Sequence, residues 1–295
     1  MMRHFIFFLF TGLSIQQASA AVVYSENFNS TSVGSTVAGW AYEGGNIWQV
    51  TADAPLDPTA PNHVFSNAGN GQQNVGVKFV SGTPIMLGST GDWIKVSFDY
   101  RYSGTPVSPG LQPYNFFRYG LYNKGSNSTF TDDIGYLADV SYWDHADANK
   151  DGDWNIRKEV NVYDAFINGI LLDNFSSADP GPSGDMLSLI TSGPAPTKSF
   201  TDGATPHSTS LLITRNGVNL EMALYQDGIL RAKGGDLSSP LMDFNTLYFE
   251  SPSDSTGFAL DNLLIETGSV PEPSRMWLLG FGCSGLLLRR RRNRV

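Results

Sequence analysis

Residues 207–235, which read HSTSLLITRNGVNLEMALYQDGILRAKGG, contain three short apolar runs separated by two turn signals. Asn216-Gly217 follows the first run and Asp227-Gly228 follows the second. Both dipeptides tolerate the positive φ angles that two-residue hairpin turns require. From 218 to 224 an apolar residue stands at every second position, which is the period of a half-buried strand. The stretch therefore predicts a three-stranded antiparallel meander over residues 210–232.

Other parts of the chain show the same pattern. Residues 92–101 alternate strictly between apolar and polar side chains, which predicts a long strand with one buried face. Residues 55–74 and 176–207 are rich in Pro, Gly and Ser and are expected to be loops, with a strand or helical turn at 186–190. Further strands are expected at 22–28, 46–50, 75–80, 116–122, 139–143, 154–163, 246–250 and 257–266. Many short strands with Gly-rich turns predict an all-β sandwich or barrel.

Composition excludes several classes of protein. The 295 residues carry a net charge of −9, which argues against a nucleic-acid partner. The single Cys cannot form an intramolecular disulfide, and no C-x-x-C pair is present for zinc. No Gly-rich stretch follows a strand and opens a helix, so no phosphate-binding loop is expected.

The first residues have the pattern of a secretory signal. Arg3 and His4 form a short basic start, and residues 5–15 are mainly apolar. Ala18-Ser19-Ala20 then supplies the small side chains of a cleavage site. The sequence therefore predicts a signal peptide over residues 1–20, which signal peptidase removes after Ala20.

The other end contains a second targeting pattern. Pro271-Glu272-Pro273 precedes an apolar run at 276–288, and a basic cluster follows it. The cluster includes Arg289, Arg290, Arg291 and Arg292. Thirteen residues cover about 20 Å of a hydrocarbon core that is about 30 Å thick, which suits a transient sorting signal better than a lasting anchor. Arginines beside an apolar stretch stay in the cytoplasm, so the body is expected on the outer side.

This tail resembles a PEP-CTERM sorting signal, over residues 268–295. The resemblance implies processing by an exosortase-type membrane enzyme of a Gram-negative-type cell, with cleavage near Pro271-Glu272-Pro273. It implies an inner-membrane stage, followed by the cell surface or extracellular matrix. Proteins with such tails are often associated with exopolysaccharide and biofilm. The alternative is an ordinary single-pass tail anchor.

Residues 207–235 also resemble the hairpin region of laminin-G and concanavalin A-like lectin/glucanase domains. The later runs FNTLYFE (244–250) and GFALDNLLIE (257–266) fit the closing strands of such domains. The resemblance implies a jelly-roll β-sandwich over residues 21–267, flanked by the signal helix and the short C-terminal hydrophobic helix. These motifs are structural, so they speak for the fold rather than for chemistry.

The segment DANKDGD at 147–153 places an oxygen-bearing side chain at every second position and glycine at the sixth. This matches the first half of a calcium loop, because Ca²⁺ takes about six to eight oxygen ligands. The match ends at position 12, where Lys158 stands in place of a bidentate glutamate. Two interpretations stay open: a structural Ca²⁺ site or a solvated acidic turn. The candidate ligands are Asp147, Asn149, Asp151 and Asp153.

Trp143 and Trp154 flank this acidic segment. Large aromatic side chains can stack on sugar rings or fill a core. The two tryptophans are therefore candidate ligand-binding residues beside the calcium loop, and core packing is the alternative.

Catalytic motifs are absent from the sequence. The glucanases of the concanavalin A-like class resemble one another in an E-x-D-x-x-E strand, and no such run occurs here. There is no G-x-S-x-G or H-E-x-x-H motif. His63, His145 and His207 are expected in surface loops. The chain is therefore predicted not to be an enzyme.

Three functions remain. The first is an exported surface or matrix protein with a structural or adhesive sandwich. The second is a lectin-like carbohydrate-binding module, with or without calcium dependence, whose partner is an extracellular polysaccharide. The third is a divergent polysaccharide-degrading enzyme. Because the arginine cluster lies in the tail, the body is more acidic than the net charge of −9 indicates.

Overall fold

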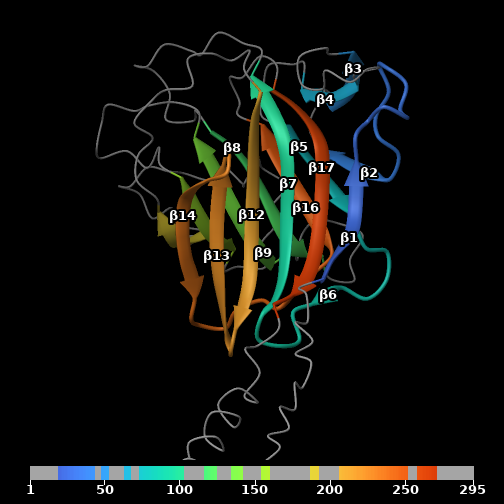
Figure 1. Cartoon of the computed structure of the whole chain (residues 1–295). Coiled ribbons are helices and arrows are strands. Elements are labelled where there is room, and N and C mark those ends of the chain that lie inside the picture. Colours follow the sequence, from blue (N-terminus) through green and yellow to red (C-terminus); the bar gives the residue numbers. More distant parts are fainter. Residues whose placement is uncertain are drawn as a thin grey trace, which may run out of the picture.

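The computed structural model describes residues 19–43, 48–52, 63–67, 73–102, 116–124, 134–141, 154–159, 187–192, 206–251 and 258–270. These residues form two large antiparallel sheets that lie face to face (Figure 1). Among them, no helix is long and apolar enough to cross a membrane. The apolar runs at 5–15 and 276–288 and the acidic segment at 147–153 lie outside the described residues.

The first sheet has eight strands and is centred on β7 (Asp92–Tyr102) and β17 (Phe258–Ser269). Its order is β14-β13-β12-β7-β17-β4-β3, and β1 pairs with β17 from Leu263 to Ser269. The other strands are β1 (Ser19–Glu26), β3 (Trp48–Ala52), β4 (His63–Asn67), β12 (His207–Asn216), β13 (Asn219–Gln226) and β14 (Ile229–Asp236). The predicted meander is therefore confirmed as β12, β13 and β14.

The second sheet has seven strands in the order β11-β10-β9-β8-β16-β5-β2. Its strands are β2 (Trp40–Glu43), β5 (Gln73–Lys78), β8 (Phe116–Asn123), β9 (Ile134–Ser141), β10 (Asn155–Glu159), β11 (Leu187–Ser192) and β16 (Thr246–Ser251). A small pair, β6 (Ile85–Met86) with β15 (Asp243–Phe244), completes the described strands.

The two sheets bury their apolar faces against each other. In β7 the residues Ile94, Val96, Phe98 and Tyr100 are buried, as the alternation at 92–101 predicts. Phe98 bridges the sheets, because its ring centroid lies 4.8 Å from that of Tyr119 and 5.2 Å from that of Phe249. The predicted all-β sandwich is therefore confirmed.

The two hairpin turns of the meander differ in detail. Asp227 and Gly228 have φ angles of 50° and 72°, and they are the two central residues of their turn, as predicted. In the other turn Asn216 pairs with Asn219, so the central residues are Gly217 and Val218. The prediction that Val218 shares the buried face of β13 is wrong, because its side chain lies at the tip of the turn and is 76% exposed.

Several predicted boundaries are wrong. The expected loop at 55–74 contains β4, which pairs with both β3 and β17. His63 and His207 lie in strands rather than in loops. At 186–190, where the sequence allows either a strand or a helical turn, the strand is confirmed, because β11 begins at Leu187. Strand β17 continues through Ser269, three residues beyond its predicted end at 266, because Thr267 to Ser269 still pair with β7.

An aromatic cluster fills one end of the space between the sheets. Its members are Phe28, Trp40, Trp48 and Phe65, all at most 7% exposed. Phe65 stacks on Phe28 and Trp48, with centroid distances of 5.4 and 4.9 Å. Phe65 belongs to β4, so this unpredicted strand carries a central residue of the core.

Gly91 holds the end of β17 in place. The Val270 amide donates to the Gly91 carbonyl at 2.9 Å, and a Cβ at Gly91, whose φ is +88°, would lie 2.5 Å from the Val270 carbonyl oxygen. We expect Gly91→Ala to lower the unfolding free energy by about 2–3 kcal/mol, because positive φ strain adds to a clash with backbone. Urea titration measures the loss.

Gly34→Ala is the matched control for this prediction. Gly34 has a φ of +85°, but no atom lies within 4 Å of its added Cβ. Its variant should lose only about 1 kcal/mol from backbone strain. Equal losses in the two variants would show that Gly91 does not clamp Val270.

Candidate functional site

The strand register defines two ends of the sandwich. We call the end with the Asp227-Gly228 turn the upper end and the end with the Gly217-Val218 turn the lower end. Strand β7 finishes at the upper end, since Tyr100 pairs with His207 at the start of β12. In the other sheet, the end of β9 lies beside the start of β10, where Asp139 pairs with Asn155. Strands from both sheets therefore present their termini to segments outside the described residues.

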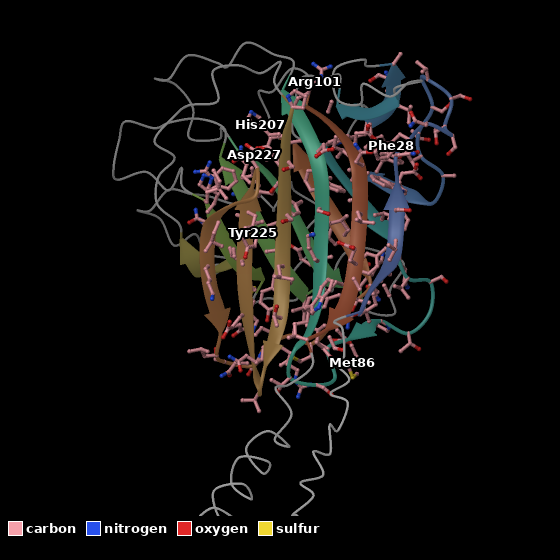
Figure 2. All side chains as sticks on the ribbon, in the orientation of Figure 1. Phe28, Met86, Arg101, His207, Tyr225 and Asp227 are labelled. Carbon is pink, nitrogen blue, oxygen red and sulfur yellow. The ribbon has the colours of Figure 1, made fainter. Side chains whose placement is uncertain are left out.

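His207 and Asp227 form a polar pair at the upper end (Figure 2). His207 Nδ1 lies 2.9 Å from Asp227 Oδ2, and the Ser208 amide donates to Asp227 Oδ1 at 2.9 Å. The Asp227 amide donates in turn to the Ser208 carbonyl. The side chains of His207 and Asp227 are 17% and 39% exposed. Backbone contacts therefore fix a carboxylate that still reaches solvent beside an imidazole.

The buried Tyr100 side chain lies next to this pair. The Tyr100 ring centroid lies 5.9 Å from that of His207. Burial raises the pKa of the Tyr100 hydroxyl well above its usual range, the charge of Asp227 raises it further, and Arg231 opposes the shift. The Tyr100 hydroxyl therefore stays neutral and able to donate a hydrogen bond over the whole physiological range.

Gln226 is the residue before the turn, and it is completely buried. Among the described residues, neither its amide nitrogen nor its amide oxygen has a hydrogen-bond partner. Such a group is costly to bury, and in native proteins it is normally satisfied by water or by a ligand. Gln226 therefore adds one donor group and one acceptor to the interior side of the upper end.

Trp154 lies immediately before β10 and is also completely buried. Arg231 lies over its ring, with the guanidinium carbon 5.7 Å from the ring centroid. Trp154 belongs to the hydrophobic core and presents no exposed face to a sugar, so the hypothesis of stacking gains no support at this residue. Trp143 and the candidate ligands Asp147, Asn149, Asp151 and Asp153 lie outside the described residues.

A buried arginine lies in the seven-stranded sheet. Arg118 of β8 is completely buried, and its backbone pairs with Glu250 of β16 and Asp139 of β9. A buried guanidinium needs negative partners to offset its lost hydration, and the two neighbouring strands have acidic residues at the paired positions. The sequence analysis missed this arginine. Its signal is the single basic residue in the apolar run at 116–122.

Lys158, Asp236 and Tyr136 form a second polar group, which ties the sheets together at the lower end. Lys158 Nζ and the Tyr136 hydroxyl each lie 2.7 Å from Asp236 Oδ2, and the Ser238 amide donates to Oδ1. Burial alone would raise the pKa of the Asp236 carboxyl, but hydrogen bonds from Lys158, Tyr136 and Ser238 outweigh it and lower that pKa. Tyr136 in turn accepts from the Leu241 amide. These contacts leave little exposed surface, which indicates a structural role.

Ala20, the predicted last residue of the signal peptide, lies in β1 and pairs with Gly268. Pro271, Glu272, Pro273 and the arginine cluster lie outside the described residues. In the part of the chain that the structure describes, no group of three or more His, Cys, Asp or Glu side chains is arranged to hold a metal ion.

No family model and no curated protein matches the chain. Among solved structures, it is similar to a protein of unknown function with a galectin-like fold from Bacillus subtilis. That likeness has a TM-score of 0.50 and 13% identity, and it covers 86% of this chain and 99% of the other. At this identity the likeness shows the fold alone: the chain contains a galectin-like β-sandwich.

Two weaker likenesses are to carbohydrate-binding domains. The carbohydrate recognition domain of Emp46p in its potassium-bound form has a TM-score of 0.48 and 11% identity, covering 82% of this chain and 96% of the other. The carbohydrate-binding module CBM66 from Bacillus subtilis has a TM-score of 0.37 and 15% identity, covering 77% and 95%.

Proposed function

We propose that this chain is an exported, non-catalytic protein whose sandwich binds carbohydrate at its upper end. The observation that carries the proposal is the His207–Asp227 pair, which is held by backbone contacts and still reaches solvent. Ligand sites combine a few fixed polar groups with aromatic and apolar walls. At the upper end a carboxylate and an imidazole stand beside the Tyr100 ring, so sugar hydroxyls would find an acceptor and a second polar partner.

Export completes the proposal. The signal peptide pattern ending at Ala20 and the Pro271-Glu272-Pro273 tail support secretion followed by exosortase-type processing. The ligand would then be a polysaccharide of the cell surface or extracellular matrix. The segment at 147–153 connects β9 to β10. The end of β9 lies at the upper end, because Val140 pairs with Phe117, whose ring centroid is 4.8 Å from that of Tyr100. Ca²⁺ bound by this segment would therefore act close to the sugar site.

Asp227→Asn tests the sugar site without disturbing the turn. Asn accepts positive φ well, so it suits the φ of 50° at this position, and it retains an acceptor for the Ser208 amide. We expect the variant to bind an immobilised glycan about tenfold to hundredfold more weakly, the loss typical of one charged hydrogen bond. Glycan-array screening of the purified protein, with and without EDTA, identifies the glycan, and calorimetry then measures the affinity.

Glu221→Gln is the control, because Glu221 lies near the lower end of the same sheet and is 48% exposed. Its variant should bind as the unchanged protein does. Equal binding by the Asp227 variant would place the site elsewhere. Failure of the unchanged protein to bind any glycan would favour the structural or adhesive role, and release of reducing sugar from a matrix polysaccharide would favour the enzyme.

A further inference from the structure

The lower end of the sandwich carries exposed apolar side chains. Val218 is 76% exposed at the tip of its turn, Leu237 is 75% exposed just after β14, and Met86 is 67% exposed in β6. Val270, the last described residue, is 53% exposed. Met86 lies at the opposite end from His207 and Asp227 in Figure 2. We call Met86, Val218, Leu237 and Val270 the lower apolar surface.

Hydrogen bonds hold the segments of this surface together. The Gly91 amide donates to the Arg215 carbonyl, and the Val270 amide donates to the Gly91 carbonyl. The Arg215 side chain donates to the Leu87 carbonyl at 2.7 Å, and the Leu87 amide donates to the Met242 carbonyl. The segments that carry Met86, Val218 and Val270 are therefore braced against one another, and little further ordering is needed when these side chains meet a partner.

Both apolar terminal segments join the body at this end. Met276, where the apolar run begins, is the sixth residue after Val270, so a fully extended link between them spans about 20 Å. Ser19, the first described residue, pairs with Ser269, and the apolar run at 5–15 precedes it. If the tail enters a bilayer, the lower end must stay close to that bilayer.

We propose that the lower apolar surface docks on the lipid bilayer that receives the tail. The proposal rests on the export and exosortase-type processing put forward under the proposed function, since processing by a membrane enzyme requires the apolar tail to enter the bilayer. Apolar side chains on a membrane-facing surface enter the boundary between headgroups and acyl chains, and binding grows with the apolar area that they bury. Because the acidic body is repelled by anionic lipid, the apolar side chains supply the attraction at this end. Docking presents the upper end, with its sugar site, away from the membrane.

A fluorescent label reports this contact in the full-length protein. Cys283→Ser removes the only thiol, and Val218→Cys or Leu237→Cys then introduces one labelling site each. Leu230→Cys is the matched control, since Leu230 is also an exposed leucine, 46% accessible, but lies beside the Asp227-Gly228 turn at the upper end. Each labelled protein is reconstituted into phospholipid vesicles that contain anionic lipid and brominated acyl chains.

We expect emission from the labels at Val218 and Leu237 to shift to the blue and to be quenched by the brominated lipid. The label at Leu230 should behave as it does in water. Vesicle flotation is measured on the same samples. If the protein floats but all three labels behave alike, the docking proposal is overturned and tail insertion stands. If the protein does not float, tail insertion and docking both fail. The glycan assay is independent of either result.

Discussion

An Asp236→Ala variant is expected to lose about 3–5 kcal/mol of unfolding free energy, the usual cost of removing one partner from a buried ion pair. Asp236 and Lys158 are 3% and 13% exposed, and their charged atoms lie 2.7 Å apart. Removal of the carboxylate leaves the Lys158 ammonium without its counter-ion and the Tyr136 hydroxyl without its acceptor. Among the described residues, Lys158 would retain the carbonyls of Ser238 and Ser239 as acceptors. Urea titration at neutral pH measures the change.

Lys233→Ala is the control on the same strand. Lys233 Nζ lies 3.9 Å from Glu221 Oε2, and the two side chains are 60% and 48% exposed, so the pair is expected to contribute less than about 1 kcal/mol. A loss in the Asp236 variant no larger than in this control would contradict the structural role of the network.

The pH dependence of stability gives an independent check on Asp236. Its folded-state pKa lies below the usual value, so the unfolded chain binds the proton more tightly. The stabilisation is therefore complete above the unfolded pKa, near 4, and is lost as the pH falls through the folded pKa. Asp236→Asn should be less stable at neutral pH and should lose less stability on acidification than the unchanged protein.

Phe65→Ala is expected to cost about 3–5 kcal/mol, because it opens a cavity at the centre of the aromatic cluster. The Phe65 side chain is completely buried, and its ring lies 4.9 Å from both Trp40 and Trp48, measured between centroids. The edge-to-face and stacked contacts with these rings are lost together with the buried area. Tryptophan fluorescence during urea unfolding measures the loss and reports directly on the two neighbours.

Phe65→Leu provides the graded comparison. It keeps much of the buried volume, so it should cost clearly less than the alanine variant. Val33→Ala, at a side chain that is 53% exposed, should change the stability by no more than about 0.5 kcal/mol. If Phe65→Ala resembled the Val33 variant, β4 would not belong to the core.

Much of the sandwich could be predicted because local patterns determine it. The Asp227-Gly228 turn and the alternation at 92–101 report backbone preference and burial within a few residues, and both are confirmed. Strand β4 could not be found in this way. It has only five residues, and its strand conformation is set by pairing with β3 and β17 and by packing of Phe65. Tertiary contacts of this kind leave no local pattern.

The His207–Asp227 pair shows how a small error in register hides a site. With Asn216 and Gly217 as the central turn residues, residue 206 would lie opposite Asp227. The observed centre at Gly217 and Val218 instead places Ser208 opposite Asp227, with His207 adjacent. A shift of two residues in the pairing of β12 with β13 therefore decides whether the His207 imidazole can reach the Asp227 carboxylate. The acidic segment and the tail remain sequence-based predictions, because their residues lie outside the described ones.

The pairing of β1 with β17 also sets an order of events during synthesis. Ser19 lies opposite Ser269, so the first strand receives its partner only when almost the whole chain has been made. Contacts between residues so distant in the sequence form late in folding. Before β1 pairs with β17, the peptide bond after Ala20 lies in unfolded, accessible chain. After pairing, it lies within the hydrogen-bonded ladder of the two strands. A leader removed at this bond would therefore have to be cut before β1 pairs with β17, since completion of the sheet makes the bond inaccessible.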